Sequence, residues 1–133
     1  MIKTYFADTN FYLRLLLQDI KDQATETENL LKKARDKKIL IIFLPEVILE
    51  MTFVLESFYK VSKDQISRHI KTLVKTDYLD IKNRNIWMES FEIYEKNNIS
   101  IFDIYLFLQA QKNGSEVLSY DTDFKKLQKL FGK

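Results

Sequence analysis

Four acidic residues that stand far apart in the sequence, Asp8, Glu50, Asp103 and Asp121, have the type and placement expected of a shared cation site. They are separated by 42, 53 and 18 residues, so only the fold can bring them together. Carboxylates in one cleft repel each other unless a proton or a cation neutralises them. Oxygen ligands alone favour a hard divalent ion, Mg²⁺ or Mn²⁺. Such an ion activates a bound water and stabilises charge on a phosphoryl oxygen, the chemistry of phosphodiester hydrolysis.

Short apolar runs predict the strands that would position two of these acids. The four predicted strands are Ile2–Ala7, Ile39–Leu44, Leu79–Ile81 and Glu116–Tyr120. The second has no alternation of polar and apolar residues, which is typical of a strand buried on both faces of a parallel sheet. Asp8 and Asp121 directly follow the first and the last strand. In parallel sheets, sites form at the carboxyl ends of the strands, so this edge is where we expect the site.

Helical periodicity and capping residues fill the segments between the strands. The predicted helices are Asn10–Gln18, Asp22–Lys38, Pro45–Tyr59, Ser62–Lys75, Asn85–Lys96, Ser100–Lys112 and Asp123–Leu130. Strands that alternate with helices imply crossover connections and a sheet covered on both sides. The expected fold is therefore a helix-rich, three-layer α/β/α domain spanning residues 1–133, with a short parallel sheet of four or five strands.

Composition excludes several classes of protein. The chain has 133 residues, two Gly, one Pro and no Cys, so disulfide frameworks, thiol nucleophiles and Gly-rich nucleotide loops are excluded. The longest unbroken apolar run has six residues, far short of the ~20 of a membrane span. The N-terminus has no signal-peptide pattern, and we expect a cytoplasmic protein without a membrane anchor.

The charge balance favours a polyanionic substrate. The net charge is +2, from 21 basic and 19 acidic residues. Setting aside the four candidate acids leaves 21 basic against 15 acidic residues, a net +6. A basic body around an acidic pocket suits delivery of a polyanion such as RNA to a bound metal. Lys125 and Lys126 follow the predicted pocket closely enough to be candidate phosphate contacts, although solvated lysines are the simpler reading.

Each acid also has an ordinary structural interpretation. Asp8 is well placed to cap the first helix, and Asp103 fits a capping box at the start of its own helix. Glu50 would be unremarkable as a solvated helix residue, and Asp121 and Asp123 as turn or cap residues. Two strands ending in Asp, together with acids at two helix starts, are nevertheless more than capping requires.

Four segments together resemble the PIN domain family. They are Phe6–Leu17 (FADTNFYLRLLL), Pro45–Leu55 (PEVILEMTFVL), Phe102–Ala110 (FDIYLFLQA) and Val117–Phe124 (VLSYDTDF). The opening Asp-Thr-Asn and the closing Asp-x-Asp-Phe are the most specific pieces. In length and order the chain is similar to the stand-alone PIN ribonucleases that act as VapC-type toxins of type II toxin–antitoxin modules.

The resemblance implies a Mg²⁺- or Mn²⁺-dependent endoribonuclease. In the family pattern, Asp8, Glu50, Asp103 and Asp121 match the catalytic acidic quartet. Asp123 then joins Asp8, Asp103 and Asp121 as a metal ligand, and Asn10 and Ser119 match polar residues that brace the carboxylates. The resemblance further implies an RNA substrate, a homodimer and a cognate antitoxin protein.

Two other functions compete with the nuclease. A receiver-type phosphoacceptor domain also uses Mg²⁺ and aspartate, but it needs adjacent acids after the first strand, where this chain has Thr9 and Asn10. A non-catalytic PIN-like module that binds RNA or a protein is the closer alternative. The presence of all four acids argues against such a degenerate site.

Overall fold

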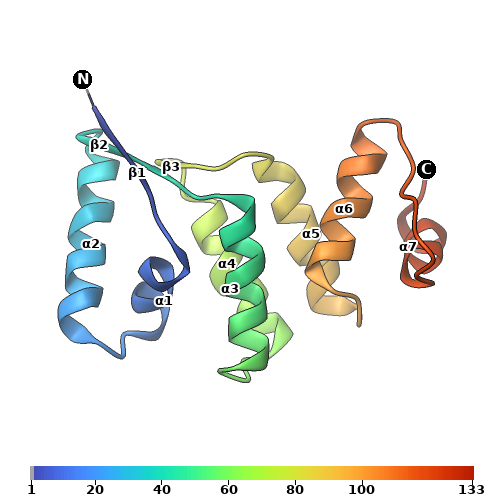
Figure 1. Ribbon diagram of the computed structural model, residues 1–133, viewed down its shortest axis with the longest axis horizontal. Coiled ribbons are helices and arrows are strands. Elements are labelled where there is room, and N and C mark those ends of the chain that lie inside the picture. The colour runs from blue at the N-terminus through green and yellow to red at the C-terminus, as the bar shows by residue number, and fades with distance from the viewer. Residues whose placement is uncertain (1) are drawn as a thin grey trace.

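Three parallel strands form the sheet of this protein, and two helices join each consecutive pair of strands. The computed structural model describes residues 2–133, drawn in Figure 1. The elements found there are β1 (Lys3–Phe6), α1 (Thr9–Leu17), α2 (Lys21–Arg35), β2 (Ile39–Ile42), α3 (Pro45–Ser57), α4 (Lys63–Val74), β3 (Leu79–Asp80), α5 (Arg84–Lys96), α6 (Ile101–Lys112) and α7 (Asp123–Phe131).

The sheet order is β1-β2-β3, with β2 in the centre. Lys3 lies opposite Ile39 and Phe6 opposite Ile42, while Ile42 also lies opposite Asp80 on the other side. All three strands therefore end at the same edge, and Asp8 follows β1 at that edge. This part of the parallel α/β prediction is confirmed.

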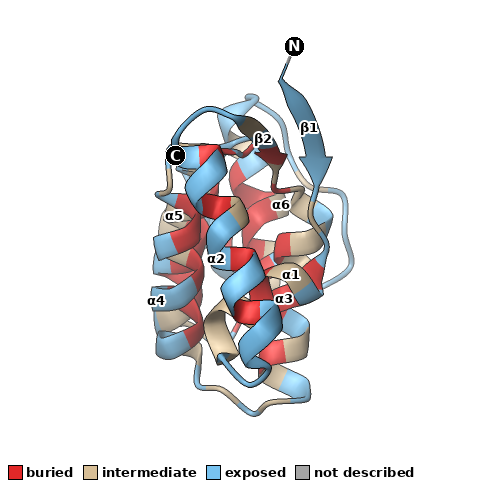
Figure 2. Ribbon diagram, turned by 90° about the vertical axis from the view of Figure 1, so that its left-hand side faces the viewer, coloured by how far each residue is buried: buried red, intermediate tan, exposed pale blue. Residues whose placement is uncertain are grey.

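The two faces of the sheet differ in exposure. Side chains alternate along a strand, so Phe6 and Leu40 project from one face and Ile41 from the other. Ile41 is buried, and α2 packs against β2, whereas Phe6 is 67% exposed and Leu40 38% exposed. Figure 2 shows β1 exposed along its whole length. The prediction that the second strand is buried on both faces is therefore wrong at Leu40, because no helix covers that side chain.

The core lies between the helices, and their buried faces turn inward in Figure 2. Aromatic side chains join α5 to α6: the Trp87 ring stacks on Tyr105 with centroids 3.6 Å apart and planes 6° apart. The Asn83 amide donates a hydrogen bond to the Tyr105 hydroxyl at 2.9 Å. This contact fixes α6, the helix that carries Asp103. Within residues 2–133, none of the helices has the length and apolar character needed to cross a bilayer.

The predicted strand Glu116–Tyr120 is absent, and the sheet accordingly has three strands in the described residues where four or five were predicted. A strand needs a neighbour to pair with, and this segment follows α6, which packs on α5 away from the sheet. Figure 1 shows α6 and α7 at the opposite end of the molecule from β1. The apolar side chains of Leu118 and Tyr120 are 98% and 107% exposed as a result.

Replacing the buried indole tests the α5–α6 contact. Trp87 is fully buried, so we expect Trp87→Ala to lower the free energy of unfolding by about 3–5 kcal/mol, through lost burial and the cavity left behind. Phe53, which is 67% exposed on α3, is the control, and Phe53→Ala should change stability by only about 0.5 kcal/mol. Urea unfolding followed by far-UV circular dichroism measures both. A loss below about 1 kcal/mol in Trp87→Ala would contradict the packing described.

Candidate metal centre

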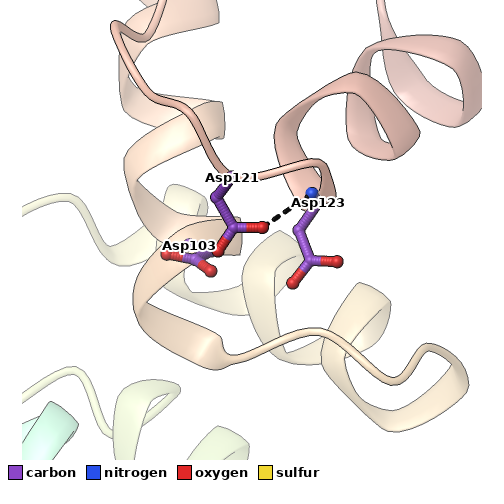
Figure 3. Close-up of side chains that lie close together, drawn as sticks. All are labelled: Asp103, Asp121 and Asp123. Atoms are coloured by element: carbon purple, nitrogen blue, oxygen red, sulfur yellow. Dashed lines mark hydrogen bonds between the residues drawn. The ribbon is translucent and has the colours of Figure 1, made fainter.

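Three carboxylates meet where α6 and α7 approach each other. Asp103 lies in the first turn of α6, Asp121 lies two residues before α7, and Asp123 is the first residue of α7. One oxygen from each lies within 4.8 Å of the others. Figure 3 shows the Asp121 carboxylate pointing toward Asp103, with Asp123 beside it. Eighteen residues separate the first two acids, so the α6–α7 pairing creates this cluster.

Short polar side chains hold the backbone at all three positions. The Ser100 Oγ accepts a hydrogen bond from the Asp103 amide at 3.2 Å, and the Ser119 Oγ accepts one from the Asp121 amide at 2.9 Å. The Asp121 carboxylate accepts one from the Asp123 amide at 2.9 Å, shown as the dashed line in Figure 3. These bonds are the capping and turn contacts that Ser and Asp form locally. The same contacts that start α6 and α7 therefore also aim the carboxylates.

Packing between α6 and α7 also fixes the position of the cluster. Leu127, on the inner face of α7, is fully buried, and the Gln111 amide on α6 donates to the Phe131 carbonyl at 2.9 Å. This hydrogen bond ties the C-terminal end of α6 to the end of α7. The positions of Asp121 and Asp123 relative to Asp103 thus depend on packing as well as on the turn itself.

The cluster has an unbalanced negative charge. Partial burial raises the pKa of Asp103 above its ordinary range, and the hydrogen bond with Ser100 opposes that rise. The neighbouring carboxylates of Asp121 and Asp123 raise the pKa further. Both causes of the increase disfavour a bare negative charge at Asp103. A cation held between the three side chains would remove the repulsion.

The donor set fits a hard divalent ion. Magnesium binds six oxygens at about 2.0–2.1 Å, which places its ligands about 2.9–4.2 Å from one another. Oxygens that lie within 4.8 Å of one another are close to that spacing. Three carboxylates leave the remaining positions for water or substrate oxygens. Asp103, Asp121 and Asp123 are therefore the residues that would hold Mg²⁺ or Mn²⁺.

Asp8 and Glu50 lie outside this cluster. The Asp8 carboxylate caps α1 by accepting a hydrogen bond from the Phe11 amide at 3.1 Å, and Glu50 is exposed on α3. In Figure 1, α1 lies near one end of the molecule and α7 at the other, with α3, α4 and α5 between them. Of the predicted metal ligands Asp8, Asp103, Asp121 and Asp123, the structure thus brings the last three together. Asp8 and Glu50 of the predicted quartet lie elsewhere.

Of the remaining predicted site residues, some lie at the cluster or beside it and others lie elsewhere. Ser119 contacts the cluster through the Asp121 amide, while Asn10 is exposed on α1 next to Asp8. Lys125 lines a hollow that also contains Asp121, and Lys126 is exposed but does not line it. Sequence analysis missed Lys129 and Lys133, which line the same hollow. They follow Lys125 by four and eight residues, and this repeat of four is the signal that sequence analysis could have used.

A comparison with protein families identifies the chain. The PIN domain model matches residues 5–130. The chain belongs to the PIN domain family. It is also 30% identical over 88 residues to a VapC ribonuclease of Aquifex aeolicus, and this match covers 65% of this chain and 65% of the relative. No solved structure matches this PIN domain.

The raised pKa of Asp103 predicts that neutralising this residue stabilises the metal-free PIN domain, by an amount that depends on pH. Because folding raises this pKa above its ordinary 3.8, the folded state binds the proton more tightly, and the charged group costs stability at neutral pH. Asp103→Asn should therefore raise Tm at pH 7, on the order of 2 °C. The gain should shrink as pH falls through the raised pKa and vanish below about 3.8.

Thermal unfolding in EDTA across this pH range is the measurement. Asp22→Asn removes the same charge from the exposed first turn of α2 and serves as the control. We expect no gain in the control at pH 7. An unchanged or lower Tm for Asp103→Asn at pH 7 would show that the three carboxylates do not repel each other as described.

Proposed function

We propose that this PIN domain is a divalent-metal-dependent endoribonuclease that hydrolyses RNA phosphodiester bonds. The observation that carries the proposal is the cluster of Asp103, Asp121 and Asp123, whose oxygens lie within 4.8 Å of one another. Family membership supports it, and so does the likeness to a protein named a VapC ribonuclease. The match covers 65% of each chain, so activity and substrate are inferred here for this protein.

The three carboxylates of the cluster would be the metal ligands, and the neighbouring side chains orient them. A bound Mg²⁺ or Mn²⁺ would lower the pKa of a coordinated water and stabilise charge on the phosphate. Asp103, Asp121 and Asp123 would hold the cation. Ser100 and Ser119 keep two of these residues in place through their backbone amides, so the carboxylates need little reorganisation.

We propose further that Val117–Tyr120 pairs with β1 as a fourth strand in the catalytic state. In residues 2–133, β1 pairs with β2 alone, and its other edge is unpaired. The segment is rich in residues that favour strands, and its Leu118 and Tyr120 side chains are exposed. Parallel pairing would bring Asp121 to the edge of the sheet where Asp8 follows β1. Asp8, and Glu50 after it, would then lie beside the cluster.

The biological setting follows from the same likeness. We propose that the protein is the toxin of a type II toxin–antitoxin module, acts in the cytoplasm as a homodimer, and is silenced by a small antitoxin protein. The alternative is a non-catalytic PIN-like module that binds RNA or a protein. Calorimetric titration with Mn²⁺ separates the two, since a site that has lost its function should not bind the ion.

Removal of a cluster carboxylate should abolish cleavage. We expect Asp103→Asn and Asp121→Asn each to reduce the rate of Mn²⁺-dependent RNA cleavage by at least about 100-fold, or about 2.7 kcal/mol, because each removes a charged ligand. Asp22→Asn on α2 is the control and should keep the parent rate. Cleavage of total RNA followed by end-mapping gives the rates and the sites. Full activity of both cluster variants, or activity in EDTA, would refute the assignment.

A disulfide test addresses the proposed fourth strand. The chain has no cysteine, so a double variant forms one defined bridge. When Asp121 is aligned with Asp8, Leu118 lies opposite Tyr5, and neighbouring strands fall within the Cα separation that a disulfide spans. We expect Tyr5→Cys/Leu118→Cys to form an intramolecular disulfide under mild oxidation.

Phe53→Cys/Leu118→Cys is the matched control, since Phe53 is an exposed aromatic residue on another element. Non-reducing gels separate monomers with an internal bridge from cross-linked dimers. Equal cross-linking in both pairs, or none in either, would contradict the proposed pairing. A dimer formed by the first pair alone would show that the strand comes from a second copy of the chain.

A further inference from the structure

A hollow of about 860 Å³ lies between α6, the following loop and α7. Its lining includes Gln111, Glu116, Asp121, Lys125, Lys129 and Lys133. Since Asp121 also belongs to the cluster, the hollow opens directly beside the candidate metal centre. The basic residues that line it are thus placed next to the acidic residues that would act on a phosphate.

The three lysines follow one another at intervals of four residues, two of them on α7 and the third just beyond it, and are called the row here. Lys125 and Lys129 are one turn apart on α7, about 6 Å along the axis, and Lys133 follows just after the helix ends. All three are exposed. Among the ion pairs formed by residues 2–133, none involves any of them. Their ammonium groups therefore remain available to a ligand.

The lysines of the row repel one another, which destabilises the protein, and a bound anion would offset that repulsion. Like charges four residues apart on a helix destabilise it by about 0.2–0.5 kcal/mol per pair. Lys126, the neighbour of Lys125, does not line the hollow and so is not part of the row. The row faces the hollow, beside the Gln111 amide that already contacts the end of α7. A polyanion lying in the hollow would relieve the repulsion between the lysines.

We propose that this hollow, in the described conformation in which Val117–Tyr120 is unpaired, binds the sugar–phosphate backbone of single-stranded RNA, with Lys125, Lys129 and Lys133 on successive phosphates leading to the cluster. The inference rests on the proposed nuclease function and names the path of its substrate. The volume of the hollow, about 860 Å³, is in the range of pockets that enclose a drug-sized ligand, which suits a short stretch of one strand. Lysine contacts to phosphates give affinity without base preference.

The experiment measures binding of a fluorescein-labelled 12-nucleotide RNA by anisotropy in EDTA, at 50–200 mM KCl, so that cleavage does not consume the probe. The test variant is Lys125→Gln/Lys129→Gln/Lys133→Gln. The control, Lys32→Gln/Lys33→Gln/Lys38→Gln, removes the same charge from exposed positions outside the hollow. Circular dichroism checks that both variants are folded.

Each phosphate contact with a single strand adds about 0.7 to the slope of log affinity against log salt. We expect the test variant to lose about 2 from this slope, while the control keeps the parent slope. Over the fourfold range of salt, parent affinity should then fall about 20-fold more than that of the test variant. Glu116→Gln, which removes an anion from the same lining, should strengthen binding about twofold.

Several outcomes would overturn the inference. These are no RNA binding by the parent, equal slope changes in the two triple variants, or equal affinity for a duplex of the same sequence. A polyglutamate peptide that binds more tightly than RNA through the same lysines would assign the hollow to an acidic protein segment. Cleavage in Mn²⁺ is scored separately. Lysine-dependent binding without cleavage would refute the nuclease alone, and cleavage with an unchanged slope would refute this RNA path alone.

Discussion

Repulsion among three carboxylates is the constraint on which the functional end of this molecule depends. Oxygens of Asp103, Asp121 and Asp123 lie within 4.8 Å of one another, and the raised pKa of Asp103 reflects both burial and that repulsion. The hydrogen bonds that hold the three residues involve their backbone amides, and only one of them ends on a carboxylate of the cluster. The fold therefore fixes the positions of the charges without neutralising them, which leaves that role to a cation.

Contacts that lie away from the sheet hold the three carboxylates close together. The Trp87–Tyr105 stack joins α5 to α6, and the buried Leu127 joins α7 to the core. The part of the molecule formed by α6 and α7 is thus built on helix packing, while Asp8 follows β1 and caps α1. Asp8 and the cluster are therefore held in place by different contacts.

The sequence predicted what local interactions determine. Ser100 was expected to cap α6 and Asp8 to suit the cap of α1, and both side chains accept the expected amide hydrogen bonds. Each bond spans three residues, so the sequence contains both partners. The segment Glu116–Tyr120 differs, because a strand exists only if another strand lies beside it. Its residue types favour a strand, but whether it reaches β1 depends on where α6 packs, which no local pattern contains. The same limit applies to the expected meeting of Asp8 with Asp121, which the structure does not bring together.

The lysine row shows a second limit of prediction from sequence, which concerns the direction of side chains on a helix. Adjacency in sequence suggested Lys125 and Lys126 together, yet neighbours on a helix point about 100° apart, and only the first lines the hollow. The row shares that hollow with Asp121 of the acidic cluster, so opposite charges would act on one ligand there. A cation that neutralised the cluster would reduce its repulsion of an RNA phosphate bound by the lysines, and would thereby raise the RNA affinity above that of the metal-free protein. Because coupling between two ligands is reciprocal, bound RNA would then raise cation affinity by the same factor. Acidic and basic residues at one site would thus make the metal and the RNA each strengthen the binding of the other.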